Sequence, residues 1–421
     1  MQFNKTLLSN GLRLITVPMD SLESATVLVM VGVGSRYENK RNNGISHFLE
    51  HMPYKGTISK PSPMIIAKIL DGIGGEWNAF TGKEVIGYYI KSASTHLHVT
   101  TELLADLLQH PLLDREEIEK EKGVIIEEMN MYEDNPMRKI GDMYDTLLYG
   151  DTPMGWDISG TKEVIRNVKR EDFIRYMQSF YSANNITIVV TGGIHEKNVQ
   201  NLIEKHFGKM KSFPTLKALR VTENQTKPEM LFKKKKIEQA HIALGLRTVP
   251  IEHKDRYALD ILAAIMGGGT SSRLFYEVRE KRGLAYYVRT SSDNYVDCGT
   301  LVTSAGVDLG RVEEAVKVII AETRRMMKKE NITKEEIERA KEMIKGHLVL
   351  ELEDSRSVAS FYAHQEILES KVETPEEVLR HIDKVTAEEV KAVAREYLER
   401  PLNLALIGNI PDAQRLKKLL Q

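Results

Sequence analysis

Two histidines and a glutamate lie three and four residues apart in the segment GISHFLEH, residues 44–51, as they would on one face of a helix. On a helix, positions i, i+3 and i+4 share one face, so His47, Glu50 and His51 are predicted to converge. Two imidazoles suit a catalytic zinc site, which takes three protein ligands and keeps one position for water. The metal lowers the pKa of that water, and a nearby carboxylate can accept its proton. The pattern H-x-x-E-H therefore predicts two ligands, His47 and His51, and a general base, Glu50. The alternative is a charged helix whose histidines happen to lie four residues apart.

A third ligand is required, and the acidic stretch of residues 115–133 can supply it. Most carboxylates of an amphipathic helix belong to its solvated face. Glu121 and Glu128 differ, because Ile125 between them places both on or beside the apolar stripe. A carboxylate there is costly unless it is paired or binds a metal. Spacing alone does not choose between Glu127 and Glu128 as the ligand.

The composition is that of an ordinary globular chain of 421 residues, enough for roughly two to four domains. Its 59 basic and 60 acidic residues give a net charge of −1, without the positive excess typical of nucleic-acid binding. Cys298 is the single cysteine, which excludes an internal disulfide and a cysteine-based zinc cluster. We find no signal-peptide block and no run of about 18 apolar residues. We therefore expect a soluble, cytoplasmic protein with no nucleic-acid or membrane partner.

Three segments of the first half are echoed in the second half, in the same order and at a nearly constant offset. Such a set is better explained by duplication of a domain than by chance. The pairs are residues 116–122 with 335–341, 168–173 with 385–390, and ITIVVTGGI ending at Ile194 with LNLALIGNI ending at Ile410.

The duplication predicts two homologous domains, residues 1–213 and 229–421, joined by a linker of weak periodicity at residues 214–228. Strand-like and helix-like segments interleave without a strict βαβ rhythm. We therefore expect an α+β fold in which each domain has a mixed, largely antiparallel sheet with helices packed on it. In the first half, the predicted strands are Leu12–Val17, Ala25–Val33, Val85–Lys91 and Ile186–Thr191, and the predicted helices are residues 44–52, 62–73, 97–109, 115–133 and 170–181.

The segments GISHFLEHMPYKGT, WNAFTGKEVIGYYI and EKEKGVIIEEMNMYED resemble the pitrilysin family of zinc peptidases, which includes insulinase and the mitochondrial processing peptidases. In these inverzincins, H-x-x-E-H is followed by a glutamate ligand within an E-x6-E pattern. The resemblance implies that His47, His51 and Glu128 bind Zn²⁺ and that Glu50 is the base. It also implies that Glu121 supports the site without binding the metal.

Two further sets of residues carry expectations from the same resemblance. Asn78, Ala79 and Phe80 match an edge strand that aligns peptide substrates by backbone pairing. The segment GGGTSSRLFYEVREKRGLAYYV resembles the C-terminal half of the family, in which an arginine and a tyrosine assist at the scissile carbonyl. Arg279 and Tyr286 would then stabilise the oxyanion of the reaction.

The chain departs from the family pattern at two places, and one of its loops has no clear role. Pro53-Tyr54 replaces a common Leu-Phe, and the proline would end the preceding helix. Ile86 stands where a threonine is frequent. Gly267–Gly269 lacks the Lys-Ser/Thr of a phosphate-binding loop and resembles the glycine-rich loop of processing peptidases.

The leading hypothesis is a zinc metalloendopeptidase that cuts peptides or unfolded segments inside a clam-shell chamber. Because the chain holds both the zinc motif and the Arg/Tyr pair, the resemblance implies a homodimer that pairs one copy's zinc with the other copy's arginine and tyrosine. The alternatives are a non-catalytic structural subunit of a processing-peptidase-like complex and a metal hydrolase of small molecules.

Overall fold

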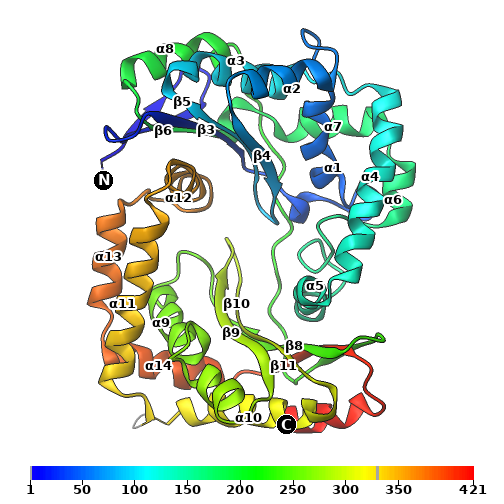
Figure 1. The fold of residues 1–421 in the computed structure, drawn as a ribbon, viewed down its shortest axis with the longest axis vertical. Coiled ribbons are helices and arrows are strands. Elements are labelled where there is room, and N and C mark those ends of the chain that lie inside the picture. Colours follow the sequence, from blue (N-terminus) through cyan, green and yellow to red (C-terminus); the bar gives the residue numbers. More distant parts are fainter. Residues whose placement is uncertain (1, 329–330) are drawn as a thin grey trace. The chain divides into compact units, whose positions relative to one another are not determined.

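The computed structural model describes residues 2–328 and 331–421 (Figure 1). The chain forms two compact units, each containing one β-sheet with helices packed on it, which confirms the expected α+β fold. Each unit is assembled from three stretches of chain. Unit 1 contains Met1–Asn130, Trp156–Leu219 and Val349–Pro375, and unit 2 contains Met131–Gly155, Arg220–Leu348 and Glu376–Gln421.

Unit 1 has a six-stranded sheet in the order β1-β2-β6-β3-β5-β4. Strands β2 and β6 pair in parallel and the other neighbours pair antiparallel, so the sheet is mixed as predicted. The central strand β3, with the sequence SATVLVMV, is rich in β-branched residues and almost wholly buried, as a strand covered on both faces should be. The strands are β1 Asn4–Leu7, β2 Arg13–Pro18, β3 Ser24–Val31, β4 Glu76–Thr81, β5 Ile86–Ala93 and β6 Ile186–Gly192.

Helices cover both faces of this sheet (Figure 1). Helices α3 and α8 pack on one face, and α12, which comes from the second half of the chain, packs on the other face against β3 and β6. The helices assigned wholly or largely to unit 1 are α1 Ile45–His51, α2 Pro63–Gly72, α3 Leu97–Gln109, α4 Arg115–Asp134, α6 Lys162–Asn167, α7 Arg170–Phe180, α8 Glu196–Phe207 and α12 Ser355–Leu368.

Unit 2 has a five-stranded sheet in the order β7-β11-β8-β10-β9, and only β7 and β11 pair in parallel. Alternate residues of β11 point to opposite faces. Leu404 and Leu406 belong to the core formed with α9, α10 and α14, whereas Ala405 and Ile407 pack with α5. The strands are β7 Met230–Lys234, β8 Gln239–Arg247, β9 Ala285–Asn294, β10 Gly299–Asp308 and β11 Asn403–Gly408. The helices are α5 Pro136–Tyr149, α9 Arg256–Gly267, π-helix η5 Phe275–Glu280, α10 Val312–Met326, α11 Lys334–Glu351, α13 Pro375–Lys384, α14 Ala387–Leu398 and 3-10 helix η8 Ala413–Leu420.

The two sheets repeat one topology, because β2-β6-β3-β5-β4 and β7-β11-β8-β10-β9 have the same order and the same single parallel pair. Strands β6 and β11, which carry the echoed apolar runs, occupy equivalent positions in their sheets. The other echoed segments lie in α4 and α11 and at the start of α7 and α14. The duplication seen in the sequence is therefore present in the fold.

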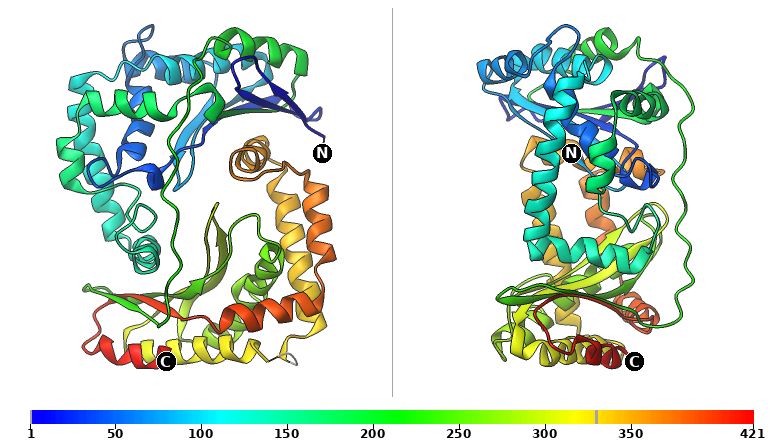
Figure 2. Two further views of the ribbon diagram at one scale, coloured as in Figure 1. Left: turned by 180° about the vertical axis from the view of Figure 1, so that it is seen from behind. Right: turned by 90° about the vertical axis from the view of Figure 1, so that its right-hand side faces the viewer.

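Residues 210–226 contain no helix or strand and run as one extended segment, seen in green in Figure 2. Most of the predicted linker, residues 214–228, falls in this segment. The boundaries 1–213 and 229–421 stay a prediction. The structure adds an exchange of two helices. Helix α5, from the first half of the chain, packs on the sheet of unit 2, and α12, from the second half, packs on the sheet of unit 1.

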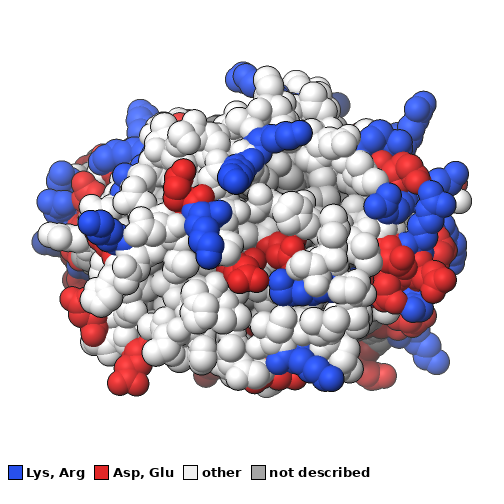
Figure 3. All heavy atoms as spheres, turned by 90° about the horizontal axis from the view of Figure 1, so that it is seen from above, with Lys and Arg blue, Asp and Glu red and all other residues white. Residues whose placement is uncertain are grey.

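Basic and acidic side chains are interspersed on the face of the molecule drawn in Figure 3, as the near-zero net charge suggests. None of the helices in residues 2–328 and 331–421 combines the length and the apolar character that crossing a bilayer would need.

Candidate metal centre

Helix α1 presents His47, Glu50 and His51 on one side because its other side is part of the core of unit 1. Phe48 and Leu49 are fully buried in that core. The rings of His47 and His51 lie 5.0 Å apart between centroids. The α-helix ends at His51, as expected from the proline two residues later, and a short 3-10 turn that contains this proline follows. The local sequence therefore positions two imidazoles and a carboxylate together.

Helix α4 brings Glu128 to the two histidines. Its Oε1 lies 3.6 Å from Nε2 of His47, and its Oε2 lies 3.6 Å from Nε2 of His51. Ligand atoms of the three residues all lie within 4.8 Å of one another. The spacing left Glu127 as an alternative, but Glu127 is exposed and does not belong to this cluster.

The distances in this cluster fit a zinc ion better than direct hydrogen bonds. A separation of 3.6 Å is too long for a hydrogen bond. Two ligand atoms bound to one tetrahedral zinc at about 2.1 Å lie about 3.4 Å from each other. Two imidazoles and one carboxylate are also a donor set that zinc accepts while keeping a position for water. The donor types of His47, His51 and Glu128, and the distance of Glu128 from each histidine, therefore suit this metal.

Glu121 lies behind His51, on the side of the ring that faces away from the cluster. Its carboxylate is hydrogen-bonded to Nδ1 of His51 at 2.9 Å and forms an ion pair with Nζ of Lys55 at 2.6 Å. Burial raises the pKa of this carboxyl group, but the hydrogen bonds from His51 and Lys55 outweigh it, so the pKa of Glu121 is lowered. A charged Glu121 orients the imidazole and makes it a better ligand. The sequence analysis did not identify Lys55.

His47 is buried, and its Nδ1 atom has no hydrogen-bond partner among the residues that the structure describes. Burial lowers the pKa of this histidine, but the carboxylates of Glu128, Glu50 and Asp157 outweigh that effect and raise the pKa. Only neutral imidazole binds a metal. A zinc ion at this site would therefore compete with a proton for His47.

Glu50 has a hydrogen-bond donor that sequence spacing did not identify. Oγ1 of Thr81, the last residue of β4, donates to Oε2 of Glu50 at 2.6 Å. Strand β4 is the outermost strand of the sheet and contacts α1. The three residues implied by resemblance, Asn78, Ala79 and Phe80, therefore lie on an edge strand beside the helix that carries Glu50.

Glu38 caps the N-terminus of α1 from outside the helix. Its Oε2 accepts hydrogen bonds from the backbone N–H of Gly44 at 2.7 Å and from Asn43, and its Oε1 accepts one from the backbone N–H of Ser46 at 2.8 Å. The side chain is 4% exposed, and burial raises the pKa of Glu38 to about 7 despite these hydrogen bonds. A glutamate six residues before Gly44 has no recognised capping spacing, so only the structure reveals it.

Arg279 and Tyr286, the other pair expected from resemblance, come together in unit 2. The guanidinium of Arg279 lies 4.8 Å from the ring centroid of Phe275 and 5.5 Å from that of Tyr286. Tyr286 is 73% exposed at the start of the edge strand β9. Arg279 belongs to the π-helix η5, an irregularity that is frequent at functional sites.

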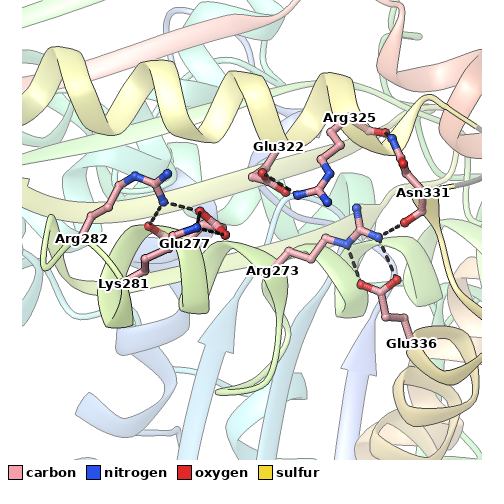
Figure 4. A network of polar contacts seen from close by, with 8 residues as sticks. All are labelled: Arg273, Glu277, Lys281, Arg282, Glu322, Arg325, Asn331 and Glu336. Atoms are coloured by element: carbon pink, nitrogen blue, oxygen red, sulfur yellow. Dashed lines mark hydrogen bonds and ion pairs between the residues drawn. The ribbon is translucent and has the colours of Figure 1, made fainter.

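A polar network holds the segment that leads into this π-helix (Figure 4). Nε and Nη2 of Arg273 donate to the two carboxylate oxygens of Glu336 at 2.6 and 2.8 Å, and Arg273 also donates to the carbonyl of Asn331. Such a paired contact between guanidinium and carboxylate has a defined geometry. It ties the start of η5 to the N-terminal turn of α11.

The glycine-rich segment Gly267–Gly269 is closely packed. A β carbon on Gly267 would lie 2.4 Å from Oγ1 of Thr290, and one on Gly268 would lie 2.6 Å from Cε of Met343. The first two glycines therefore allow the end of α9 to approach β9 and α11.

Comparisons with known proteins identify the family of the chain. The sequence model for Insulinase (Peptidase family M16) matches residues 14–162, and that for the Peptidase M16 inactive domain matches residues 167–344. An uncharacterized zinc protease of Bacillus subtilis (strain 168) is 37% identical over 406 residues, which are 96% of this chain and 98% of the relative. One from Mycobacterium leprae (strain TN) is 34% identical, over 99% of this chain and 94% of the relative.

Solved structures share the fold over nearly the whole chain. A protease from Helicobacter pylori superposes with a TM-score of 0.89 at 25% identity, covering 97% of this chain and 99% of that one. A chain of complex III2 from Candida albicans gives a TM-score of 0.85 at 19% identity, covering 99% of both chains, which is a likeness of fold alone.

Proposed function

Because the chain belongs to the M16 (insulinase) family of zinc peptidases, we propose that it is an endopeptidase that hydrolyses extended peptides aligned along strand β4. The observation that carries this proposal is the meeting of His47, His51 and Glu128 beside Glu50, at separations that suit one metal ion. Zinc bound by these three residues would supply a Lewis acid and a water molecule of lowered pKa.

In this proposal, the chain's own residues move the proton and orient the substrate. Glu50 accepts the proton of the attacking water and delivers it to the leaving amine. Glu121 keeps the ring of His51 in place through its hydrogen bond to Nδ1. Its negative charge also favours the ring as a ligand.

Strand β4 has no strand paired with its outer edge, and an extended peptide would pair there. The edge lies beside α1, so a peptide paired with residues 78–80 would run past Glu50. Pairing of this kind reads the main chain, so it favours unfolded segments over folded proteins as substrates. A closed chamber around the site, expected from the family resemblance, belongs to the same proposal.

Arg279 and Tyr286 would stabilise the oxyanion, and we propose that two copies of the chain cooperate to bring them to the metal. The zinc ligands belong to unit 1 and the Arg/Tyr pair to unit 2. The guanidinium of Arg279 lies 5.5 Å from the ring centroid of the exposed Tyr286, so both side chains can face one developing negative charge. The chain carries both sets of residues, so a homodimer would be sufficient.

The test replaces Glu50 with glutamine and measures zinc content together with cleavage of a mixed library of unstructured peptides. Glu50→Gln should keep the metal and lose hydrolysis, because the amide cannot accept the proton. Glu127→Gln, at an exposed position next to Glu128, is the matched control and should behave as wild type. Full activity of Glu50→Gln would refute the mechanism. A zinc-loaded wild type that cleaves no peptide would instead favour a non-catalytic structural subunit.

A further inference from the structure

The hydrogen bond between Thr81 and Glu50 joins the edge strand to the metal-binding helix. Thr81 is 31 residues away from Glu50 in sequence, and its hydroxyl donates to Oε2 at 2.6 Å. We propose that Thr81 is a positioning residue, which holds one oxygen of the Glu50 carboxylate so that the other, Oε1, is left to accept the proton. This inference rests on the proposed peptidase function.

Thr81 can act in this way because its backbone is held on both sides. It pairs with Ile86 at the end of the β4–β5 hairpin, and the N–H of Gly82 donates to the carbonyl of Val85 at 2.8 Å. The carbonyl of Gly82 accepts a further hydrogen bond from the N–H of Ser35 at 3.1 Å. The residue that carries the hydroxyl is therefore part of a hydrogen-bonded turn.

The turn after Thr81 is also fixed by charged side chains that are buried. Arg36 and Glu84 form an ion pair in which both side chains are almost fully buried. Lys83 is 7% exposed, and its ammonium donates to the backbone carbonyl of Trp156 at 2.6 Å. Breaking such buried pairs is costly, so the turn has little freedom to move. The position of the Thr81 hydroxyl is thus set by unit 1 as a whole.

The direction of the Thr81 side chain follows from the alternation of residues along β4. Side chains of successive residues point to opposite faces of a strand, so Thr81 shares a face with Ala79 and Phe80 points to the other. Ala79 packs against the core of unit 1, to which Phe48 and Leu49 of α1 belong. The ring of Phe80 instead lies over Gly87 of the neighbouring strand. The face of Thr81 is therefore the one that meets α1.

The hydrogen bond from Thr81 restricts a carboxylate that is otherwise free to move. Its side chain has three rotatable bonds and is only half-buried. Among the residues that the structure describes, no donor other than Thr81 is hydrogen-bonded to its carboxylate. A general base must lie within hydrogen-bond reach of the proton it accepts. A displacement of the order of 1 Å can cost about 100-fold in rate.

The experiment compares Thr81→Val, which keeps the shape and removes the hydroxyl, with Thr81→Ser, which keeps the hydroxyl. Zinc content, thermal stability, kcat and KM for an unstructured peptide are measured for both. Thr81→Val should lower kcat by about 10–100-fold with KM and zinc content close to wild type. Thr81→Ser should recover kcat to within a few-fold of wild type. Thr6→Val, on the opposite edge strand β1 of the same sheet, is the control for losing a strand threonine.

Three results would overturn the inference: an unchanged kcat in Thr81→Val, a Thr81→Ser variant as slow as Thr81→Val, or a rise of KM with no change in kcat. The last would mean that the hydroxyl serves substrate binding instead of the base. If Thr81→Val is unstable, Thr81→Ala takes its place. A kcat that is low in Thr81→Ala and near wild type in Thr81→Ser supports the inference, and equal kcat values in the two variants overturn it. A wild type and Thr6→Val that both cleave nothing would overturn the proposed function, and this inference with it.

Discussion

Replacing Glu121 with glutamine should weaken zinc binding by about 10–100-fold although every proposed ligand remains, because it alters the partner of one ligand. The carboxylate is 3% exposed and contacts both Nδ1 of His51 and the ammonium of Lys55. The amide keeps one acceptor oxygen, so the ring of His51 can still be oriented. What is lost is the negative charge beside an imidazole that becomes more positive when it binds a cation.

The structure places the expected effect near the upper end of that range. A loss of 10–100-fold corresponds to about 1.4–2.7 kcal/mol of binding free energy. In the glutamine variant, the ammonium of Lys55 keeps its positive charge and loses its carboxylate partner, so it repels the incoming metal. Replacing Lys55 with methionine in the Glu121→Gln background should therefore restore part of the affinity. Lys55→Met alone should not weaken zinc binding as Glu121→Gln does, because it removes a positive charge near the site and leaves the Glu121 carboxylate in place.

The assay is competition for zinc between the protein and a chromophoric chelator at constant pH and ionic strength. Glu117→Gln is the matched control, because Glu117 lies one turn earlier on α4 and pairs only with exposed Lys120 in the structure. It should leave the zinc affinity within about twofold of wild type, as expected for a surface pair. Wild-type affinity in Glu121→Gln, or an equal loss in Glu117→Gln, would refute the reasoning.

Three further predictions concern stability, substrate alignment and assembly. Burial raises the pKa of Glu38 to about 7 from an ordinary value of 4.5, so folding favours its protonated form. Metal-free wild type should therefore gain thermal stability relative to Glu38→Gln as the pH falls from 7 to 4.5. A difference in stability that does not depend on pH would contradict this cause. Gly87→Ala should keep zinc but lower peptide hydrolysis, because a β carbon there would lie 2.3 Å from Cζ of Phe80 and force this ring, which belongs to the residues proposed to align the peptide, to move; wild-type kinetics would show that moving the ring does not affect alignment. Mixing inactive Glu50→Gln and Arg279→Ala chains should restore about a quarter of the wild-type rate after subunit exchange if each site is shared by two copies, and no recovery would speak against the homodimer.

Long amphipathic helices and buried strands could be predicted from the sequence, because their apolar residues repeat with a clear period. The predicted helices 62–73, 97–109, 115–133 and 170–181 correspond to α2, α3, α4 and α7 within one residue at each end. Helix α5 was not predicted, although Asn135 accepts a hydrogen bond from the N–H of Arg138 and Pro136 opens the helix, which is a recognisable start signal.

Strand β4 could not be found from periodicity. Every residue of its sequence EWNAFT is exposed or half-buried, because β4 is an edge strand whose side chains lie at the margin of the core. Only the resemblance indicated a strand there. The packing of α12 on the sheet of unit 1 could not be predicted from the sequence either. The apolar pattern of a helix shows which of its faces is buried, but it does not show which sheet that face packs on.

At the candidate site too, local spacing could be predicted from the sequence and tertiary contacts could not. Helix α1 has seven residues, too few to be stable alone, so its position depends on tertiary contacts. Its two histidines and Glu50 follow from local spacing, but their supports come from far along the chain: Glu38 caps the start of the helix, Thr81 is hydrogen-bonded to Glu50, the proposed base, and Glu121 is hydrogen-bonded to His51. These supports share no spacing rule with H-x-x-E-H, since each is set by how another element packs against α1. A chain could therefore keep the whole motif and still lose metal affinity or turnover through any one of the three.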